Sequence, residues 1–329
     1  MTNPQPATTG RKKLAFSLLV LLLALSGAEI ALRCIFYQRR SRAPIALVEG
    51  FNSVQARLLA TRVAAKRGEI RITYDEAWKE LFETEEREVL LKTKIQYQAH
   101  FASLVQVARD AQTTLLVLYL PSTDPDTAKH AVEQDTRKFF RGQAERHRLP
   151  FIDLTNALRA HPWPAVTLLP LDGHLSRFGN SIVAEELDQV LADYTDASNP
   201  NQMLREDQLY GDLPPMLNEV NEITRGLPFR MQTNRQGFRN TNSIYTKERQ
   251  RILVLGDSFT YGLHLGNQDT WPAMLQARNE TREIINAGIP GYTITHELES
   301  FRDRSQFIAP DITILQVLDN DLLGLYLGE

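Results

Sequence analysis

Residues 251–262 read Arg-Ile-Leu-Val-Leu-Gly-Asp-Ser-Phe-Thr-Tyr-Gly, an apolar run that leads into Ser258. A short apolar run of this kind is typical of a buried strand in a parallel sheet, and it places the serine at the carboxyl end of that strand. The segment Leu171-Asp-Gly-His174, which precedes an amphipathic helix, supplies an aspartate and a histidine. A histidine that takes the serine proton and an aspartate that orients the imidazole turn a serine into a nucleophile. The sequence therefore predicts a Ser-His-Asp hydrolase or acyltransferase.

Apolar runs and helical segments alternate along much of the chain. We expect five short strands, at Thr114–Pro121, Leu149–Leu154, Ile252–Leu255, Glu283–Asn286 and Ile312–Val317. Helical spacing or composition marks residues 53–66, 76–112, 127–147, the segment from Ile182 to Tyr194, 270–278 and 293–305. Strands that alternate with helices indicate an α/β domain with helices on both faces of a parallel sheet. We therefore predict a three-layer sandwich with a five-stranded parallel sheet.

The middle of the chain lacks this alternation. Residues 196–226 contain Pro200, Pro214 and Pro215 among polar residues, which is typical of a linker. The next segment, Leu227–Arg239, contains Gly237, and we expect it to form a hairpin with a turn at that glycine.

The first 42 residues have the composition of a membrane segment. Residues 14–32 are apolar except for two serines, one glycine and Glu29, and a bilayer-spanning helix needs about 20 such residues. Basic residues on both sides make the positive-inside rule nearly silent on orientation. We expect residues 1–42 to be a cytoplasmic tail and single-pass transmembrane helix, with the rest of the chain in the periplasm. A cleaved signal peptide is the alternative, because Leu25-Ser-Gly-Ala28 offers small residues for a peptidase.

Charge and composition exclude several classes of function. The chain has 37 Lys and Arg residues against 40 Asp and Glu residues, and the first 42 residues contain seven of the former and one of the latter. The remainder has a net charge of about -9, which argues against a nucleic-acid partner. No Cys/His cluster has metal-ligand spacing, no glycine loop is suited to phosphate, and the single Cys34 forms no internal disulfide. We expect catalysis without a metal or cofactor.

Four short blocks stand at the ends of expected strands or the starts of expected helices. They are Gly256-Asp257-Ser258-Phe259, Asn286-Ala-Gly-Ile-Pro-Gly291, Asp319-Asn320-Asp321 and Asp172-Gly-His174. Together they resemble the blocks of the SGNH (GDSL-type) hydrolase superfamily. The N-terminal segment and Thr233–Arg239 resemble its membrane-anchored bacterial members. The resemblance covers residues 95–195 and 227–329 and implies the flavodoxin-like fold of that superfamily.

The order of the blocks departs from the usual one. In most of the family the serine block comes first and the Asp/His block last, whereas here the Asp/His block comes first. A circular permutation explains this order: residues 43–195 form the second half of the domain, residues 251–329 form the first half, and residues 196–250 join them as linker and hairpin. The periplasmic alginate O-acetyltransferases are similar in this order. The alternative is two half-domains that do not close into one domain.

The resemblance makes Ser258 the nucleophile, His174 its general base and Asp172 the carboxylate that orients the imidazole. Each assignment has a structural alternative. In this alternative, Ser258 only caps the N-terminus of a helix, and Asp172 and His174 are incidental residues of a surface loop. We interpret His264 as a loop residue and Asp257 as a residue that caps or braces its loop.

An oxyanion requires hydrogen-bond donors aimed at the developing charge. The resemblance implies three: the backbone N–H groups of Ser258 and Gly291 and the side-chain amide of Asn320. Gly288 is a weaker candidate than Gly291. Without a catalytic role, Gly291 is a turn glycine and Asn320 a turn residue at a strand end. Asp321 is expected to brace its loop.

The expected reaction is attack of Ser258 on an ester carbonyl, followed by transfer of the acyl group from the enzyme to water. We expect a membrane-anchored serine esterase that acts on O-acetyl or other acyl esters of a carbohydrate or small-molecule substrate. An O-acyltransferase that modifies an exported or cell-envelope polysaccharide uses the same residues and is the first alternative. A catalytically idle module that binds glycan or organises a membrane assembly is the second.

Overall fold

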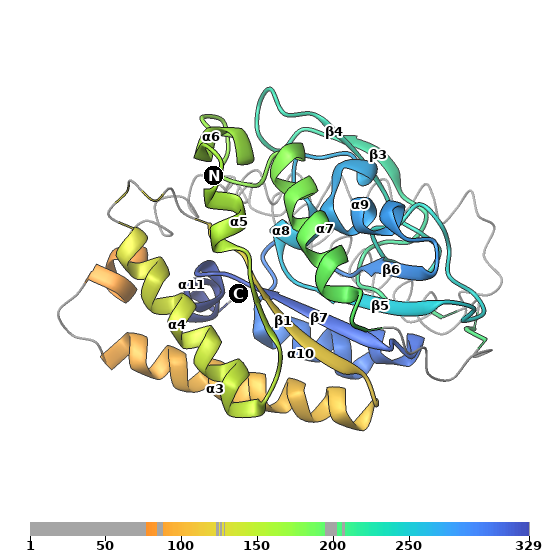
Figure 1. Cartoon of the computed structure of the whole chain (residues 1–329), viewed down its shortest axis with the longest axis horizontal. Helices are drawn as coiled ribbons and strands as arrows, with labels where there is room; N and C mark the ends of the chain where they lie inside the picture. The colour runs from red at the N-terminus through yellow and green to blue at the C-terminus, as the bar shows by residue number, and fades with distance from the viewer. Residues whose placement is uncertain are drawn as a thin grey trace, which may run out of the picture. The chain divides into compact units, whose positions relative to one another are not determined.

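Five parallel strands form the central sheet of the protein (Figure 1). The computed structural model describes residues 77–83, 88–122, 125, 127, 129–194, 203–205 and 208–328, all within one compact unit that spans residues 52–329. The strands lie in the order β2-β1-β7-β5-β6, and all neighbours pair in parallel. Their bounds are β1 Thr114–Tyr119, β2 Phe151–Asp153, β5 Gln250–Leu255, β6 Arg282–Asn286 and β7 Ile312–Val317.

The sheet confirms the strands expected from the sequence. β5 is central, with β6 on one side and β7 on the other, and β1 and β2 follow beyond β7. Segments on both sides of residues 196–250 therefore contribute to one sheet, and they do not form two separate sheets. Circular permutation, as the history behind this order, stays a hypothesis.

Helices cover both faces of the sheet and separate its core into two halves. One face packs against α3 (Glu88–Asp110), α4 (His130–His147), α10 (Ile294–Asp303) and α11 (Asn320–Leu327). The other packs against α5 (Thr155–Arg159), α6 (Trp163–Val166), α7 (Arg177–Leu191) and α9 (Trp271–Arg278). Figure 1 shows α3 and α10 on one side of β1 and β7, with α7 on the opposite side. Because successive strand side chains point to opposite faces, Leu115 and Val117 of β1 enter the first core and Leu116 the second.

A buried ionic cluster ties β5 to β7 at the amino ends of the strands. The backbone N–H of Arg251 donates to Asp311 Oδ2 at 2.8 Å, and its guanidinium donates to Glu283 Oε2 and to the carbonyl of Ile308, both at 2.6 Å. Lys247 Nζ donates to Asp311 Oδ1 at 2.6 Å. Buried charges are costly without partners, so these contacts favour one alignment of the amino ends of β5 and β7.

A two-stranded antiparallel hairpin precedes the serine half of the chain, but not where we expected it. Its strands are β3 (Asn218–Asn221) and β4 (Phe229–Gln232). The hairpin expected within Leu227–Arg239 is therefore wrong in its pairing, because the partner of β4 lies upstream. Gly237 has a φ of +84° and lies in a separate turn, in which its N–H donates to the carbonyl of Asn234 at 3.2 Å.

The segment interpreted as a linker is partly built into the domain, which corrects that interpretation. Thr233 Oγ1 donates to the carbonyl of Pro214 at 2.6 Å and accepts from the N–H of Leu217 at 2.9 Å. Tyr210 is buried in the core that contains α3. Pro214 and Pro215 therefore lie in a part of this segment that packs and hydrogen-bonds with the rest of the domain.

The expected membrane helix at residues 14–32, its signal-peptide alternative, Cys34 and the expected helix at 53–66 all lie outside the described residues. Among the residues that the structure describes, no helix is both long enough and apolar enough to cross a bilayer. The expected helix at 76–112 appears as a short π-helix, η1 (Lys79–Glu83), and the long helix α3.

Candidate active site

Ser258 stands at the carboxyl end of the central strand. After β5, the backbone at Gly256 adopts a φ of +156°, and a Cβ there would collide with the side chains of Thr260 and Gln316. Only glycine allows this turn at such close approach. The short helix α8 (Ser258–Tyr261) then begins, and Asp257 Oδ1 accepts the N–H of Phe259 at 2.9 Å. Asp257 therefore braces its loop, as expected.

A second loop brings the Asp/His block to the same edge of the sheet. The N–H of Leu168 donates to the carbonyl of His174 at 2.9 Å, and the N–H of Ser176 donates to the carbonyl of Val166 at 2.9 Å. Ser176 Oγ also accepts the N–H of Gly179 at 3.2 Å, which caps α7. These bonds hold the loop at the start of α7, and α7 packs against one face of the sheet.

Asp172, His174 and Ser258 come together as a hydrogen-bonded chain. His174 Nε2 lies 2.7 Å from Ser258 Oγ. His174 Nδ1 contacts Asp172 Oδ1, which also accepts the backbone N–H of His174 at 3.0 Å. An ionised carboxylate only accepts hydrogen bonds, so Nδ1 carries the proton and the lone pair of Nε2 faces the serine hydroxyl. This arrangement suits removal of the serine proton.

The electrostatics of the site favour an ionised Asp172. Burial by itself raises the pKa of this carboxyl, but hydrogen bonds from His174 and His264, together with the electrostatic interaction with the His174 ring, lower the pKa well below its usual range. Asp172 is therefore a carboxylate at neutral pH. A carboxylate in this position would stabilise an imidazolium at His174.

Two residues to which the sequence assigned no part in the site complete the surroundings of Asp172. His264 Nε2 lies 3.0 Å from Asp172 Oδ2, and Thr224 Oγ1 lies 3.3 Å from the same oxygen. The interpretation of His264 as a loop residue is incomplete, because the loop buries its ring against the triad. The position of His264, six residues after Ser258, indicated in the sequence that it lies near the site, whereas nothing in the sequence indicated this for Thr224.

Asp172 and the two histidines beside it raise the question of a metal ion. Ligand atoms of Asp172, His174 and His264 all lie within 4.8 Å of one another, and two imidazoles with a carboxylate suit several transition metals. Hydrogen bonds already account for this spacing, since each histidine bonds a different oxygen of Asp172. The grouping by itself therefore does not point to a metal.

The glycine block offers one free backbone donor. Residues Ile289 to Tyr292 form a turn, closed by the N–H of Tyr292 on the carbonyl of Ile289 at 3.1 Å. Gly291, with a φ of +82°, occupies the third position, where a type II turn requires a positive φ. The N–H of Gly288 is already bonded to Asn286 Oδ1 at 3.0 Å, whereas no described residue accepts the N–H of Gly291. Gly291 is therefore the better oxyanion candidate of the two, and its role stays a prediction.

Asn320 reaches the Ser258 loop through Asp257. Its Nδ2 donates to Asp257 Oδ2 at 2.9 Å, at the point where α11 begins. An amide nitrogen carries two N–H bonds, so this contact orients the group and leaves the second N–H for another acceptor. Its place beside the serine loop agrees with the expected role, which stays a prediction.

Three buried carboxyl groups, one of them in the Ser258 loop, interact with one another. They are Asp257, Glu297 and Asp321, and both Glu297 oxygens lack a hydrogen-bond partner among the described residues. Burial, and secondly the charge of Asp257, raises the pKa of Glu297 well above its usual range. Burial likewise raises the pKa of Asp321, helped by Glu297 and Asp257. Asp321 Oδ2 accepts the N–H of Leu318 at 2.7 Å, so it braces the loop as expected.

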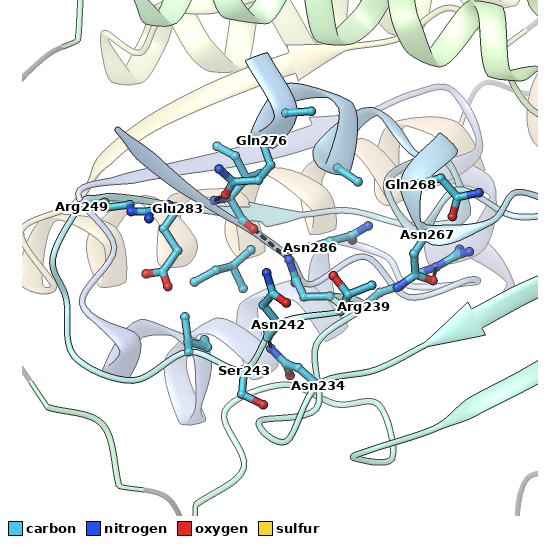
Figure 2. Close-up of a pocket in the computed structure, with 17 residues that line it drawn as sticks. Asn234, Arg239, Asn242, Ser243, Arg249, Asn267, Gln268, Gln276, Glu283 and Asn286 are labelled. Carbon is cyan, nitrogen blue, oxygen red and sulfur yellow. Dashed lines mark hydrogen bonds between the residues drawn. The ribbon is translucent and has the colours of Figure 1, made fainter. Parts of the chain in front are cut away.

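A pocket of about 390 Å³ lies away from the triad, beside the edge strand β6 (Figure 2). Many side-chain amides line it, and two of them, Asn240 and Gln276, bond the backbone of β6. Asn240 accepts the N–H of Asn286 at 3.0 Å and donates to the carbonyl of Ile284 at 2.9 Å, and Gln276 accepts the N–H of Ile284 at 2.8 Å. These amides take the place of a further strand and protect an exposed sheet edge.

Comparisons with known proteins give distant matches. No family model and no curated protein matches the sequence. Among solved structures, the chain is similar to the O-acetyltransferase domain of Pseudomonas putida AlgJ, at 12% identity and a TM-score of 0.49, over 74% of this chain and 88% of that one. It is also similar to Pseudomonas aeruginosa AlgX, at 12% identity and a TM-score of 0.38, over 70% of this chain and 60% of that one. Similarity at this level transfers no activity.

The buried carboxyl groups predict that stability falls as pH rises. A carboxyl whose pKa is raised by folding holds its proton in the folded state after the unfolded chain has lost it. Its contribution to the free energy of unfolding is therefore full below the unfolded pKa of about 4.5 and decreases as the pH rises above that value. Glu297→Gln removes this titration. We expect the variant to melt with the wild type at about pH 4.5 and to be more stable than the wild type at pH 8, as measured by thermal unfolding.

The matched control is Glu299→Gln, an exposed residue on the same helix. It removes one carboxylate without changing a buried group, and its melting curve should follow the wild type across the pH range. Identical pH dependence in wild type and Glu297→Gln would show that Glu297 does not titrate in this way.

Proposed function

We propose that this protein is an SGNH-type serine esterase or O-acyltransferase that carries an acyl group on Ser258. One observation supports this above the others: His174 Nε2 lies 2.7 Å from Ser258 Oγ while its Nδ1 contacts Asp172. Residues 84 positions apart in the chain meet in the geometry that general-base catalysis needs. A catalytically idle module has no requirement for this contact.

The reaction begins when Ser258 Oγ attacks the carbonyl carbon of an ester and His174 Nε2 takes the hydroxyl proton. The carbonyl oxygen becomes an oxyanion, for which the N–H groups of Ser258 and Gly291 and the Asn320 amide are the proposed donors. The C–O bond to the leaving alcohol then breaks, and His174 returns its proton to that alcohol. An acyl ester of Ser258 remains.

The second half repeats these steps with a new nucleophile. His174 takes a proton from water or from an acceptor hydroxyl, the oxygen attacks the acyl carbon, and the proton returns to Ser258 Oγ as the acyl group departs. Water as acceptor gives an esterase, and a sugar hydroxyl gives an O-acyltransferase. We propose an acyl-bearing carbohydrate as substrate on the strength of the SGNH resemblance. The identity of the acceptor is decided by assaying release of free acid against acylation of added polysaccharide.

Reaction with a fluorophosphonate probe tests the nucleophile without knowledge of the substrate. Such probes form a covalent bond with activated serines. Wild-type protein should be labelled on Ser258, and His174→Ala should be labelled at least about 100-fold more slowly, because general-base assistance contributes roughly 10²–10⁴-fold. Gel fluorescence over time measures the rates, and peptide mass spectrometry locates the probe.

Ser258→Ala is the control for specificity, and Ser181→Ala, on α7, is the control for general reactivity of serines. The first should abolish labelling while thermal unfolding shows an intact fold, and the second should label like the wild type. If Ser258→Ala labels as fast as the wild type, Ser258 is not the nucleophile.

We also propose that residues 14–32 anchor the chain in a membrane and that the catalytic domain works in the periplasm. The length of the apolar segment supports the membrane anchor. An ester-processing site outside the cytoplasm has access to exported and cell-envelope carbohydrate.

Reporter fusions test this topology. Alkaline phosphatase, which is active only outside the cytoplasm, should be active when fused after Glu329, and β-galactosidase at the same point should be inactive. Matched fusions that lack residues 1–42 should reverse both results. Activity of only the cytoplasmic reporter in the full chain would contradict the proposed orientation.

A further inference from the structure

Asp172 is bound on both of its oxygens by groups from three separate segments. Oδ1 faces His174 and accepts its backbone N–H. Oδ2 faces His264 Nε2 at 3.0 Å and Thr224 Oγ1 at 3.3 Å. The side that faces away from His174 is thus as fully bonded as the side that faces it.

The position of His264 is prepared by its surroundings. Its backbone has a φ of +68°, in the left-handed region that few side chains adopt. The buried Arg239 fixes the same loop, because its guanidinium donates to the carbonyls of Gly262 at 2.9 Å and Leu265 at 2.5 Å. The His264 ring packs edge-on against Phe229 of β4, with 5.9 Å between ring centroids. The fold therefore holds a strained and buried histidine in one orientation.

The hydrogen bond to Asp172 decides which nitrogen of His264 carries a proton. A carboxylate only accepts, so Nε2 must be the donor. Nδ1 is buried and has no partner among the described residues. A proton on Nδ1 would bury an unsatisfied N–H, which is unfavourable, so the neutral ring with its proton on Nε2 fits the site.

We propose that His264, assisted by Thr224, is a positioning residue that holds the Asp172 carboxylate against His174. Without it, Asp172 Oδ2 would keep only the bond from Thr224, and the carboxylate would be free to rotate away from the Nδ1–H of His174. The Nε2 lone pair of His174 would then face Ser258 for a smaller fraction of the time. This inference rests on the proposed function, because it concerns activation of the same serine.

Thr224 extends the proposal to the hairpin. It lies in the loop between β3 and β4, and its hydroxyl lies 3.3 Å from both Asp172 Oδ2 and His264 Nε2. β4 also supplies Phe229, which packs on the His264 ring. The hairpin thus contacts Asp172 through Thr224 and the His264 ring through Phe229, and Thr224 belongs to the segment that had the composition of a linker.

The rate of fluorophosphonate labelling of the full chain tests the proposal. His264→Phe keeps a ring of similar size without a donor, and we expect it to label about tenfold more slowly or worse. His264→Gln places an amide N–H near the position of Nε2, and it should label within about threefold of the wild type. Thr224→Val removes one weaker bond and should have a smaller effect than His264→Phe. Rescue by glutamine separates a hydrogen-bonding role from a role in packing.

The outcomes separate this proposal from the proposed function. If the wild type is not labelled, or if Ser258→Ala labels equally, the proposed function fails. If the wild type labels on Ser258 and folded His264→Phe labels at the same rate, the nucleophile stands and the positioning role is wrong. Failure of glutamine to rescue a slow phenylalanine variant also overturns it.

His264→Asn covers the case in which His264→Phe fails to fold. Asparagine tolerates a positive φ better than most residues, and its shorter amide stops short of Asp172. Slow labelling by folded His264→Asn, together with near-normal labelling by His264→Gln, supports the proposal. Wild-type labelling rates in His264→Asn contradict it.

Discussion

Parallel pairing of β7 with β1 on one side and β5 on the other is the constraint on which the structure depends. These two ladders join a segment that carries Asp172 and His174 to a segment that carries Ser258, although the chain visits them far apart. Carboxyl ends of parallel strands meet at one edge of a sheet, where ligands and reacting groups gather. The buried cluster of Arg251, Asp311 and Lys247 secures the opposite ends of β5 and β7, so the alignment at the active edge follows from contacts at both ends.

Carboxyl groups at this edge have two opposite environments. Asp172 receives donors on both oxygens, which keep it charged and oriented toward His174. Glu297, by contrast, is buried without a described partner, and burial raises its pKa. A neutral carboxyl group at Glu297 avoids a buried, unpaired negative charge close to Asp257. Its ionisation at higher pH would cost stability.

The sequence predicts the sheet well because its strands are largely buried and contain short apolar runs, such as Leu115–Leu118 of β1 and Ile252–Leu255 of β5. Ser258, His174 and Asp172 were accessible as candidates because Ser258 follows a strand and the other two precede an amphipathic helix. β3 was missed because Asn-Glu-Val-Asn contains one apolar residue and pairs only with β4. The contacts of Thr224 and His264 with Asp172 depend on tertiary structure alone, since 52 and 92 residues separate them from it along the chain.

The central claim is that Ser258 carries the acyl group, and trapping that intermediate tests it most directly. Purified protein is mixed with p-nitrophenyl acetate, quenched in acid within the first turnover, digested with trypsin and analysed by mass spectrometry. The peptide from Ile252 to Arg278 should carry one acetyl group, which fragmentation places on Ser258, and the adduct should disappear as the ester is exhausted. Turnover of the ester with no acetyl group on that peptide, or with one on another residue, would contradict the account.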